Sequence, residues 1–186
     1  MTPVNVGILG CGAIAPAYLR HLTHTFAPVV RVSACADLVA GLAEEKAQEF
    51  NIPRVLAPDD LLADPDIEIV VNLTPAPAHH AVSMQILRAG KHLFTEKPLA
   101  LSRGEGKEIL DTATANGLRV AGAADTFLGS GLQACRRWID DGAIGTPLAS
   151  MALVALPQRE SERYHRVFRG ALLDLGPYYL TALVAL

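Results

Sequence analysis

The sequence predicts an α/β fold in which a doubly wound parallel sheet is followed by the beginning of a second, α+β domain. Two observations predict the sheet. An apolar strand from Val4 to Leu9 leads directly into a glycine-containing turn, Gly10 to Ala15, and a second apolar strand ends at the acid Asp37. Short apolar strands then alternate with amphipathic helices as far as about residue 123. This order is typical of parallel strands joined by right-handed crossovers.

The turn after the first strand has the G-x-G-x-x-A spacing of a Rossmann dinucleotide-binding turn. Gly10 permits a tight turn, Gly12 lets the backbone approach a pyrophosphate, and Ala15 lets the next helix pack closely on the sheet. The start of that helix offers N–H groups and a positive dipole end to phosphates. We expect the pyrophosphate to bind at Gly10, Gly12, Ala13, Ile14 and Ala15, and we interpret Cys11 as a small filler residue.

Asp37 ends the strand from Val29 to Ala36, 27 positions after Gly10. A carboxylate there can accept hydrogen bonds from both ribose hydroxyls and repels a 2′-phosphate. Leu38 follows it, where a site for NADP would favour arginine. The expected cofactor is therefore NAD rather than NADP. The alternative is that Asp37 only caps the helix that begins near Val39.

The other elements of the sheet domain follow from apolar periodicity and from turn residues. The predicted helices are Ala13–His24, Val39–Phe50, Asp59–Ala63, Ala78–Ala89 and Leu101–Asn116, the last two ending at Gly90 and Gly117. The further predicted strands are a short one near Val55, the uninterrupted apolar run Ile67–Leu73, then His92–Thr95 and Leu118–Ala121. We expect the ligand at the carboxyl ends of the strands, at the switch point of the sheet.

Two of these strand ends carry polar residues. One strand runs into Thr74-Pro75-Ala76-Pro77-Ala78-His79, and the next runs into Glu96-Lys97-Pro98. In this topology both ends face the nicotinamide end of a dinucleotide. Lys97 could bind a substrate hydroxyl or help to move a proton. Alternatively, Glu96 and Lys97 could form a solvated ion pair beside a turn proline.

Composition excludes several classes of protein. The chain has 186 residues, of which 51% are hydrophobic and 19% charged, with a net charge of −3 and no basic run, so we expect no nucleic-acid partner. We find no apolar stretch as long as a membrane span and no signal peptide, which predicts a cytoplasmic protein without a membrane partner. The three cysteines lack C-x-x-C spacing, which argues against disulfides and against a metal site.

Three blocks of sequence occur in a distinctive order. They are Val6–Ala15; Val70–Ala100, which contains Thr74-Pro75, His79, Ala89-Gly90-Lys91-His92 and Glu96-Lys97-Pro98-Leu99-Ala100; and Asp141-Gly142-Ala143-Ile144-Gly145 followed by Leu173-Asp174-Leu175-Gly176-Pro177-Tyr178-Tyr179. Together they resemble the Gfo/Idh/MocA family of NAD(P)-dependent oxidoreductases, named after glucose–fructose oxidoreductase, inositol dehydrogenase and rhizopine catabolism. The resemblance covers essentially the whole chain.

The resemblance implies roles for residues at matching positions. Gly10, Gly12 and Ala15 match the family's phosphate turn, and Asp37 matches the acid that binds the adenosine ribose. Thr74, Pro75 and His79 match the loop along the nicotinamide side. Glu96 and Lys97 match the motif whose lysine contacts substrate and nicotinamide ribose, and Asp174 matches the acidic substrate-binding position. Ala76 departs from the family, which often has asparagine there.

Tyr178 stands where the family's proton-accepting histidine is usually found. A free phenol has a pKa of about 10, compared with about 6.5 for imidazole, so it is a poor base unless a cation stabilises the phenolate. Lys97 could supply that cation; otherwise Tyr178 is an orienting donor. His79, His165 and Tyr179 are weaker candidates for proton transfer.

The resemblance also implies a second domain on a large, mostly antiparallel sheet that covers the substrate and makes oligomer contacts. We expect residues 1–123 to form the NAD-binding domain and residues 124–186 the incomplete start of the second. Its expected elements are a connecting helix Asp125–Asp141, a strand Pro147–Leu156, a polar loop Gln158–Arg169 and an apolar last helix, Leu180–Leu186. We interpret the chain as a fragment of a longer protein that forms a homo-oligomer.

The leading hypothesis is an NAD-dependent dehydrogenase that oxidises a secondary alcohol of a sugar or cyclitol. Lys97 and Tyr178 would handle the hydroxyl proton, and Asp174 would hold a neighbouring hydroxyl. The alternative is a non-catalytic dinucleotide-binding redox sensor or regulatory protein, which Tyr178 favours and the intact Glu96-Lys97-Pro98 opposes. A fragment without a function of its own is the third possibility. The sequence does not identify the substrate.

Overall fold

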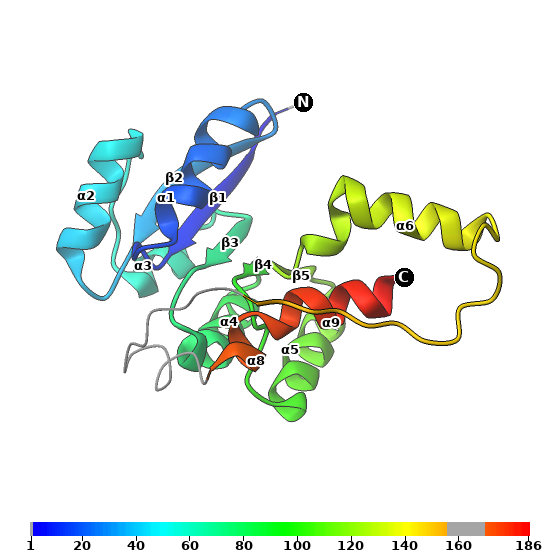
Figure 1. Cartoon of the computed structure of the whole chain (residues 1–186). Helices are drawn as coiled ribbons and strands as arrows, with labels where there is room; N and C mark the ends of the chain where they lie inside the picture. Colours follow the sequence, from blue (N-terminus) through cyan, green and yellow to red (C-terminus); the bar gives the residue numbers. More distant parts are fainter. Residues whose placement is uncertain (1, 156–169) are drawn as a thin grey trace. The chain divides into compact units, whose positions relative to one another are not determined.

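The computed structural model describes residues 2–155 and 170–186 of the chain. They belong to two compact units, Met1–Gly122 and Ala123–Leu186. In the first unit, strands and helices alternate along the chain from the N-terminus to β5 (Figure 1). Its strands are β1 Val4–Leu9, β2 Val30–Ala36, β3 Ile69–Asn72, β4 His92–Thr95 and β5 Val120–Gly122.

All five strands form one parallel sheet in the order β2-β1-β3-β4-β5. The last residue of β1, Leu9, lies opposite Ala36 of β2 and Asn72 of β3. The chain leaves β1 toward β2 on one side and later returns to β3 on the other. The carboxyl ends of β1 and β3 therefore form the switch point at which doubly wound sheets bind ligands. This order confirms the predicted fold class.

Helices bury both faces of the sheet. The helical segments of this unit are α1 Ala15–Arg20, the π-helical turn η1 His21–Thr25, α2 Ala40–Phe50, α3 Pro58–Ala63, the 3-10 turn η2 Ala76–Ala78, α4 His79–Arg88 and α5 Arg103–Ala115. On one face, Leu19 of α1 and Ala43 of α2 belong to the same buried cluster as Ile8 of β1. On the other, Ile86 of α4 and Ile109 of α5 are buried with strand residues from the centre of the sheet.

The first helix differs from the prediction in a way that the residues explain. It begins at Ala15 rather than Ala13, and after Arg20 it widens into a π-helical turn. The hydroxyl of Thr23 donates to the backbone carbonyl of Leu19 at 2.7 Å, a bond that competes with regular helical pairing. The short strand expected near Val55 is wrong, since Val55 makes only an isolated bridge with Cys35.

The second unit contains η3 Thr126–Leu128, α6 Ser130–Asp140, α8 Ala171–Asp174 and α9 Gly176–Ala185. Within it, α9 packs against η3. The single connecting helix predicted for Asp125–Asp141 is divided between η3 and α6. The last helix begins at Gly176, earlier than the predicted Leu180, with Pro177 in its first turn, where proline is favoured.

The strand predicted for Pro147–Leu156 is wrong over residues 147–155, which carry no strand in the described part of this unit. Leu148, Met151 and Leu153 of this segment are exposed. A strand needs a neighbour to pair its backbone N–H and C=O groups, and the described residues of this unit contain none. The predicted loop Gln158–Arg169 and His165 lie outside the described residues. Among residues 2–155 and 170–186, no helix has the length and apolar character needed to cross a bilayer.

Candidate functional site

The turn between β1 and α1 is packed against the end of β3. Gly10 has a φ of +98°, and a Cβ atom there would lie 2.7 Å from the carbonyl carbon of Leu73 and 2.8 Å from the backbone nitrogen of Thr74. Any side chain would therefore be strained and would collide with backbone. The amide of Gly10 also donates to the Ala36 carbonyl at 2.9 Å. These contacts explain why glycine occupies this position.

Gly12 has the opposite surroundings. A Cβ atom at Gly12 would meet nothing within 4 Å, so this part of the turn borders open space. Ala13 and Ile14 are exposed beside it, whereas Ala15 is fully buried between the helix and the sheet. The residues present therefore fit the phosphates of a dinucleotide, because the backbone of Gly12 can be approached without a side chain in between.

Asp37 is held beside this turn by two backbone amides. Its Oδ2 accepts a hydrogen bond from the Cys11 amide at 2.7 Å, and its Oδ1 accepts one from the Val39 amide at 2.8 Å. The second bond is the local one expected if Asp37 caps the next helix, while the first links β2 to the phosphate turn. Each carboxylate oxygen accepts more than one hydrogen bond, so this geometry leaves acceptor capacity for ribose hydroxyls.

Cys11 faces inward from the same turn. It is 1% exposed, and its thiol lies 3.7 Å from the Ala36 carbonyl. A hydrogen bond with the Cys35 side chain and burial both raise the pKa of Cys11 above its ordinary value. Cys11 therefore stays a neutral thiol, in agreement with its interpretation as a filler residue.

The end of β3 is organised by Asn72, which is fully buried. Its Oδ1 accepts hydrogen bonds from the Thr74 amide at 3.2 Å and the Thr74 hydroxyl at 2.6 Å. Its Nδ2 donates to the Ser83 hydroxyl at 3.3 Å and to the His79 carbonyl at 3.4 Å. This single amide therefore fixes the backbone around Thr74 and Pro75 to the start of α4.

His79 joins the two loops expected on the nicotinamide side. It is 1% exposed, with Nδ1 2.7 Å from the Pro98 carbonyl and Nε2 2.7 Å from the Thr74 carbonyl. Both ring nitrogens of His79 therefore lie within hydrogen-bond distance of backbone carbonyls. The structure places His79 among the predicted cofactor-side residues, where it connects the loop after β3 to the loop after β4.

The loop after β4 contains Glu96 and Lys97, both partly buried. The Glu96 amide donates to the Asn72 carbonyl at 2.9 Å. The Glu96 carboxylate accepts a hydrogen bond from the Tyr18 hydroxyl at 2.7 Å through Oε1, and one from the Lys97 amide at 2.8 Å through Oε2. The peptide bond between Lys97 and Pro98 is cis. The structure thus places the predicted Glu96-Lys97-Pro98 motif beside the end of β3 and in contact with α1 through Tyr18.

Asp174 and Tyr178 belong to the second unit, which we describe by itself. Asp174 ends α8, and its amide donates to the Gly170 carbonyl at 3.2 Å. Tyr178 lies in the first turn of α9, where its amide donates to the Leu175 carbonyl at 3.2 Å. Both side chains are partly buried. Asp174 and Tyr178 therefore lie on either side of the junction between α8 and α9.

Sequence reasoning missed Tyr18 and Asn72. Tyr18 lies within the predicted helix Ala13–His24 and Asn72 within the predicted strand Ile67–Leu73, and neither was expected in the site. The signal for Asn72 was present, because a polar side chain that ends a buried strand must find hydrogen-bond partners. The bond from Tyr18 to Glu96 joins residues 78 positions apart, which no local pattern reveals.

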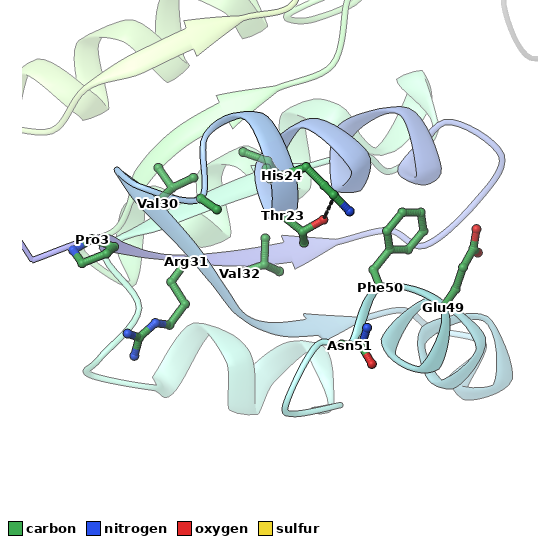
Figure 2. A pocket seen from close by; sticks show the side chains of 11 residues that line it. Pro3, Thr23, His24, Val30, Arg31, Val32, Glu49, Phe50 and Asn51 are labelled. Carbon is green, nitrogen blue, oxygen red and sulfur yellow. Dashed lines mark hydrogen bonds between the residues drawn. The ribbon is translucent and has the colours of Figure 1, made fainter.

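A hollow lies near the amino-terminal ends of β1 and β2, away from the carboxyl ends of the strands that carry the candidate site. Pro3, Val30, Arg31, Glu49 and Asn51 are among its lining residues, and the nearby Thr23 hydroxyl and His24 Nδ1 lie 2.9 Å apart (Figure 2). These residues adjoin the beginnings of β1 and β2 and the end of α2. The phosphate turn and Asp37 instead follow the ends of those strands, so the hollow is separate from the candidate site.

The sheet order, the phosphate turn and the acid after β2 define a dinucleotide-binding domain of the Rossmann class. Residues 4–123 match the GFO_IDH_MocA family, described as an oxidoreductase family with an NAD-binding Rossmann fold. The chain belongs to this family, which confirms the resemblance inferred from its sequence blocks.

Relatives include enzymes that act on cyclitols and sugars. The chain is 37% identical over 148 residues to an inositol 2-dehydrogenase/D-chiro-inositol 3-dehydrogenase of Lactiplantibacillus plantarum. The matched region covers 77% of this chain and 42% of the relative. A solved myo-inositol dehydrogenase from Lactobacillus casei, in complex with NAD(H) and myo-inositol, is 31% identical with a TM-score of 0.74 over 79% of this chain and 44% of that one.

A 3-ketoreductase from Actinomadura kijaniata, solved with NADP and TDP-benzene, is 29% identical with a TM-score of 0.78 over 94% of this chain and 55% of that one. The chain thus spans about half the length of the relatives it matches. The family includes proteins that bind NAD and proteins that bind NADP.

Proposed function

We propose that this chain is the cofactor-binding part of an NAD-dependent oxidoreductase that transfers hydride between nicotinamide and a secondary alcohol of a sugar or cyclitol. The observation that carries the proposal is the open space at Gly12, next to Cys11, whose amide holds the carboxylate of Asp37. A dinucleotide needs this combination, because its pyrophosphate must reach backbone while its adenosine ribose meets an acceptor.

The surroundings of Asp37 support a preference for NAD over NADP. The carboxylate is anchored by the Cys11 and Val39 amides, so it cannot easily rotate away from a bound ribose. Leu38 beside it is 94% exposed and carries no charge that could pair with a phosphate. A 2′-phosphate at this position would meet a fixed negative charge at short range, which is unfavourable.

The chemistry is assigned to residues of both units. The bound nicotinamide would supply the hydride acceptor or donor. Lys97, from the loop after β4, would act on the substrate hydroxyl and its proton. Tyr178 would either take up that proton or orient the hydroxyl, and Asp174 would hold a neighbouring hydroxyl. We further propose that residues 124–186 begin the substrate domain and that the complete protein is a homo-oligomer.

The known relatives support this substrate class. One is named for inositol oxidation, and another was solved with a TDP compound. Polyhydroxylated rings share adjacent secondary hydroxyls, one for the proposed role of Lys97 and one for that of Asp174.

Calorimetric titration of the chain with NAD and NADP tests the proposal. NAD should bind more tightly than NADP, and Asp37→Ala should reduce that difference because it removes the charge that repels the 2′-phosphate. Equal or tighter binding of NADP by the unmodified chain would contradict the role given to Asp37.

Tyr178 supports a second candidate, a dinucleotide-binding redox sensor or regulatory protein without catalysis. A phenol in the proton-accepting position is a weak base at neutral pH. Turnover by the complete protein with any sugar alcohol or cyclitol would exclude this candidate.

A further inference from the structure

The side chain of Tyr18 links the first helix to the loop after β4. Its hydroxyl donates to Glu96 Oε1 at 2.7 Å. Its ring packs edge to face on Phe94 of β4, with the ring centroids 6.0 Å apart and the planes at 69°. The ring of Tyr18 therefore contacts β4, and its hydroxyl contacts the loop that follows β4.

The bond from Tyr18 decides how the Glu96 carboxylate is oriented. While Oε1 faces the phenol, Oε2 accepts a hydrogen bond from the Lys97 amide at 2.8 Å. The Glu96 amide is fixed separately, since it donates to the Asn72 carbonyl at 2.9 Å. Both ends of Glu96 are thus anchored, and the carboxylate in turn anchors the backbone of Lys97. Hydrogen bonds to an ionised acceptor are stronger than bonds between neutral groups.

Tyr18 also belongs to the helix that begins at the phosphate turn. It lies three residues after Ala15, and its neighbour Leu19 is fully buried against the sheet. The helix cannot shift without moving that buried contact. A dinucleotide that binds at the turn and at the loop after β4 would therefore contact two segments that Tyr18 holds in register.

We propose that Tyr18 is a positioning residue, which sets the Glu96–Lys97 loop at the nicotinamide end through its bond to the Glu96 carboxylate. This inference rests on the proposed function. It assigns Tyr18 no contact with cofactor or substrate. It predicts that the phenol oxygen matters for the nicotinamide half of the cofactor and not for the adenosine diphosphate half.

Tyr18→Phe tests the inference on the 186-residue chain, because it removes the hydroxyl and keeps the ring that packs on Phe94. NADH and ADP-ribose are titrated in parallel. The variant should bind NADH about threefold to tenfold more weakly, as expected from partial loss of one charge-assisted hydrogen bond, while ADP-ribose affinity stays unchanged. Thr23→Val, which removes the Thr23–Leu19 bond further along the same helical segment, is the matched control and should change neither affinity.

Hydrogen exchange measures the positioning without any ligand. In the wild-type chain the Lys97 amide is bonded to Glu96 and should exchange slowly, whereas in Tyr18→Phe it should exchange about tenfold faster, with amides of the central strands unchanged. Glu96→Ala removes the acceptor, and Tyr18→Phe should then have no additional effect on NADH binding. If Glu96→Ala does not fold, Glu96→Gln is used, and the effect of Tyr18→Phe should be smaller in it than in the wild type.

Unchanged exchange at Lys97 in Tyr18→Phe would overturn the inference even if NADH bound more weakly. Unchanged NADH affinity in this variant would overturn it as well. Equal weakening of NADH and ADP-ribose would also overturn it, since that result indicates a general structural role for the helix. A wild-type chain that binds neither ligand would instead overturn the proposed function, and this inference with it.

Discussion

Gly10 and Gly12 are two residues apart in one turn, yet their surroundings predict opposite consequences of substitution. A Cβ atom at Gly12 meets nothing within 4 Å, so Gly12→Val should change the free energy of unfolding by only about 0.5 kcal/mol or less. Its methyl groups would occupy the space proposed for the pyrophosphate. Loss of two charge-assisted hydrogen bonds, each worth about 1.5–3 kcal/mol, should weaken NAD binding by about 100-fold or more.

Gly10→Ala should instead destabilise the fold. Its Cβ would lie 2.7 Å from backbone at Leu73, at a φ of +98°. Overpacking costs about 1–3 kcal/mol and the strained backbone conformation about 1–3 kcal/mol, so the free energy of unfolding should fall by about 2–6 kcal/mol. This is a large part of the roughly 5–15 kcal/mol typical of a domain.

Urea unfolding followed by circular dichroism measures the stability of both variants, and calorimetry with NAD measures their affinity. Stability and binding should separate: Gly12→Val should fold normally and bind NAD much more weakly, whereas Gly10→Ala should lose stability. Full NAD affinity in Gly12→Val would refute the placement of the pyrophosphate. Wild-type stability in Gly10→Ala would refute the packing derived for the turn.

Two further predictions concern catalysis and acid stability. In the complete protein, Lys97→Ala should lower kcat by about 10²–10⁴ with NAD affinity nearly unchanged, as steady-state kinetics and calorimetry can show. A comparable loss in Tyr178→Phe would place the tyrosine in the proton path, whereas a small loss would make it an orienting group. A hydrogen bond from the Asp66 amide and the nearby Arg54 guanidinium lower the pKa of Asp64 below its ordinary 3.8. The ionised Asp64 carboxylate therefore stabilises the folded state fully at pH values above 3.8, and this contribution is lost as the pH falls through the lowered pKa of the folded state. Asp64→Asn should flatten the acid limb of a stability–pH curve, and an unchanged slope would contradict the assignment.

The phosphate turn and Asp37 could be predicted from the sequence because their signals are local. The turn lies within six consecutive residues, and Gly10 and Gly12 are distinguished by spacing alone. Asp37 follows a β-branched strand whose end is unambiguous. The doubly wound parallel sheet could also be predicted, from the alternation of strands and helices, since right-handed crossovers leave few alternatives.

The contacts of Tyr18, Asn72 and His79 could not be predicted, because each depends on a partner brought close only by the folded sheet. Tyr18 bonds to a residue 78 positions away and His79 to one 19 positions away. The strand predicted at residues 147–155 failed for a related reason. Its sequence is apolar enough, but a strand exists only with a neighbour to pair its backbone.

Assigned backbone NMR spectra of the chain, recorded during titration with NAD, show residue by residue where the dinucleotide binds. We expect the largest amide shifts at Cys11, Gly12 and Ala13, with further shifts at Asp37 and in the loop after β4. NADP should produce smaller shifts at equal concentration. The absence of shifts at the turn, or shifts confined to the hollow around Arg31 and Asn51, would show that the dinucleotide does not bind at the proposed site.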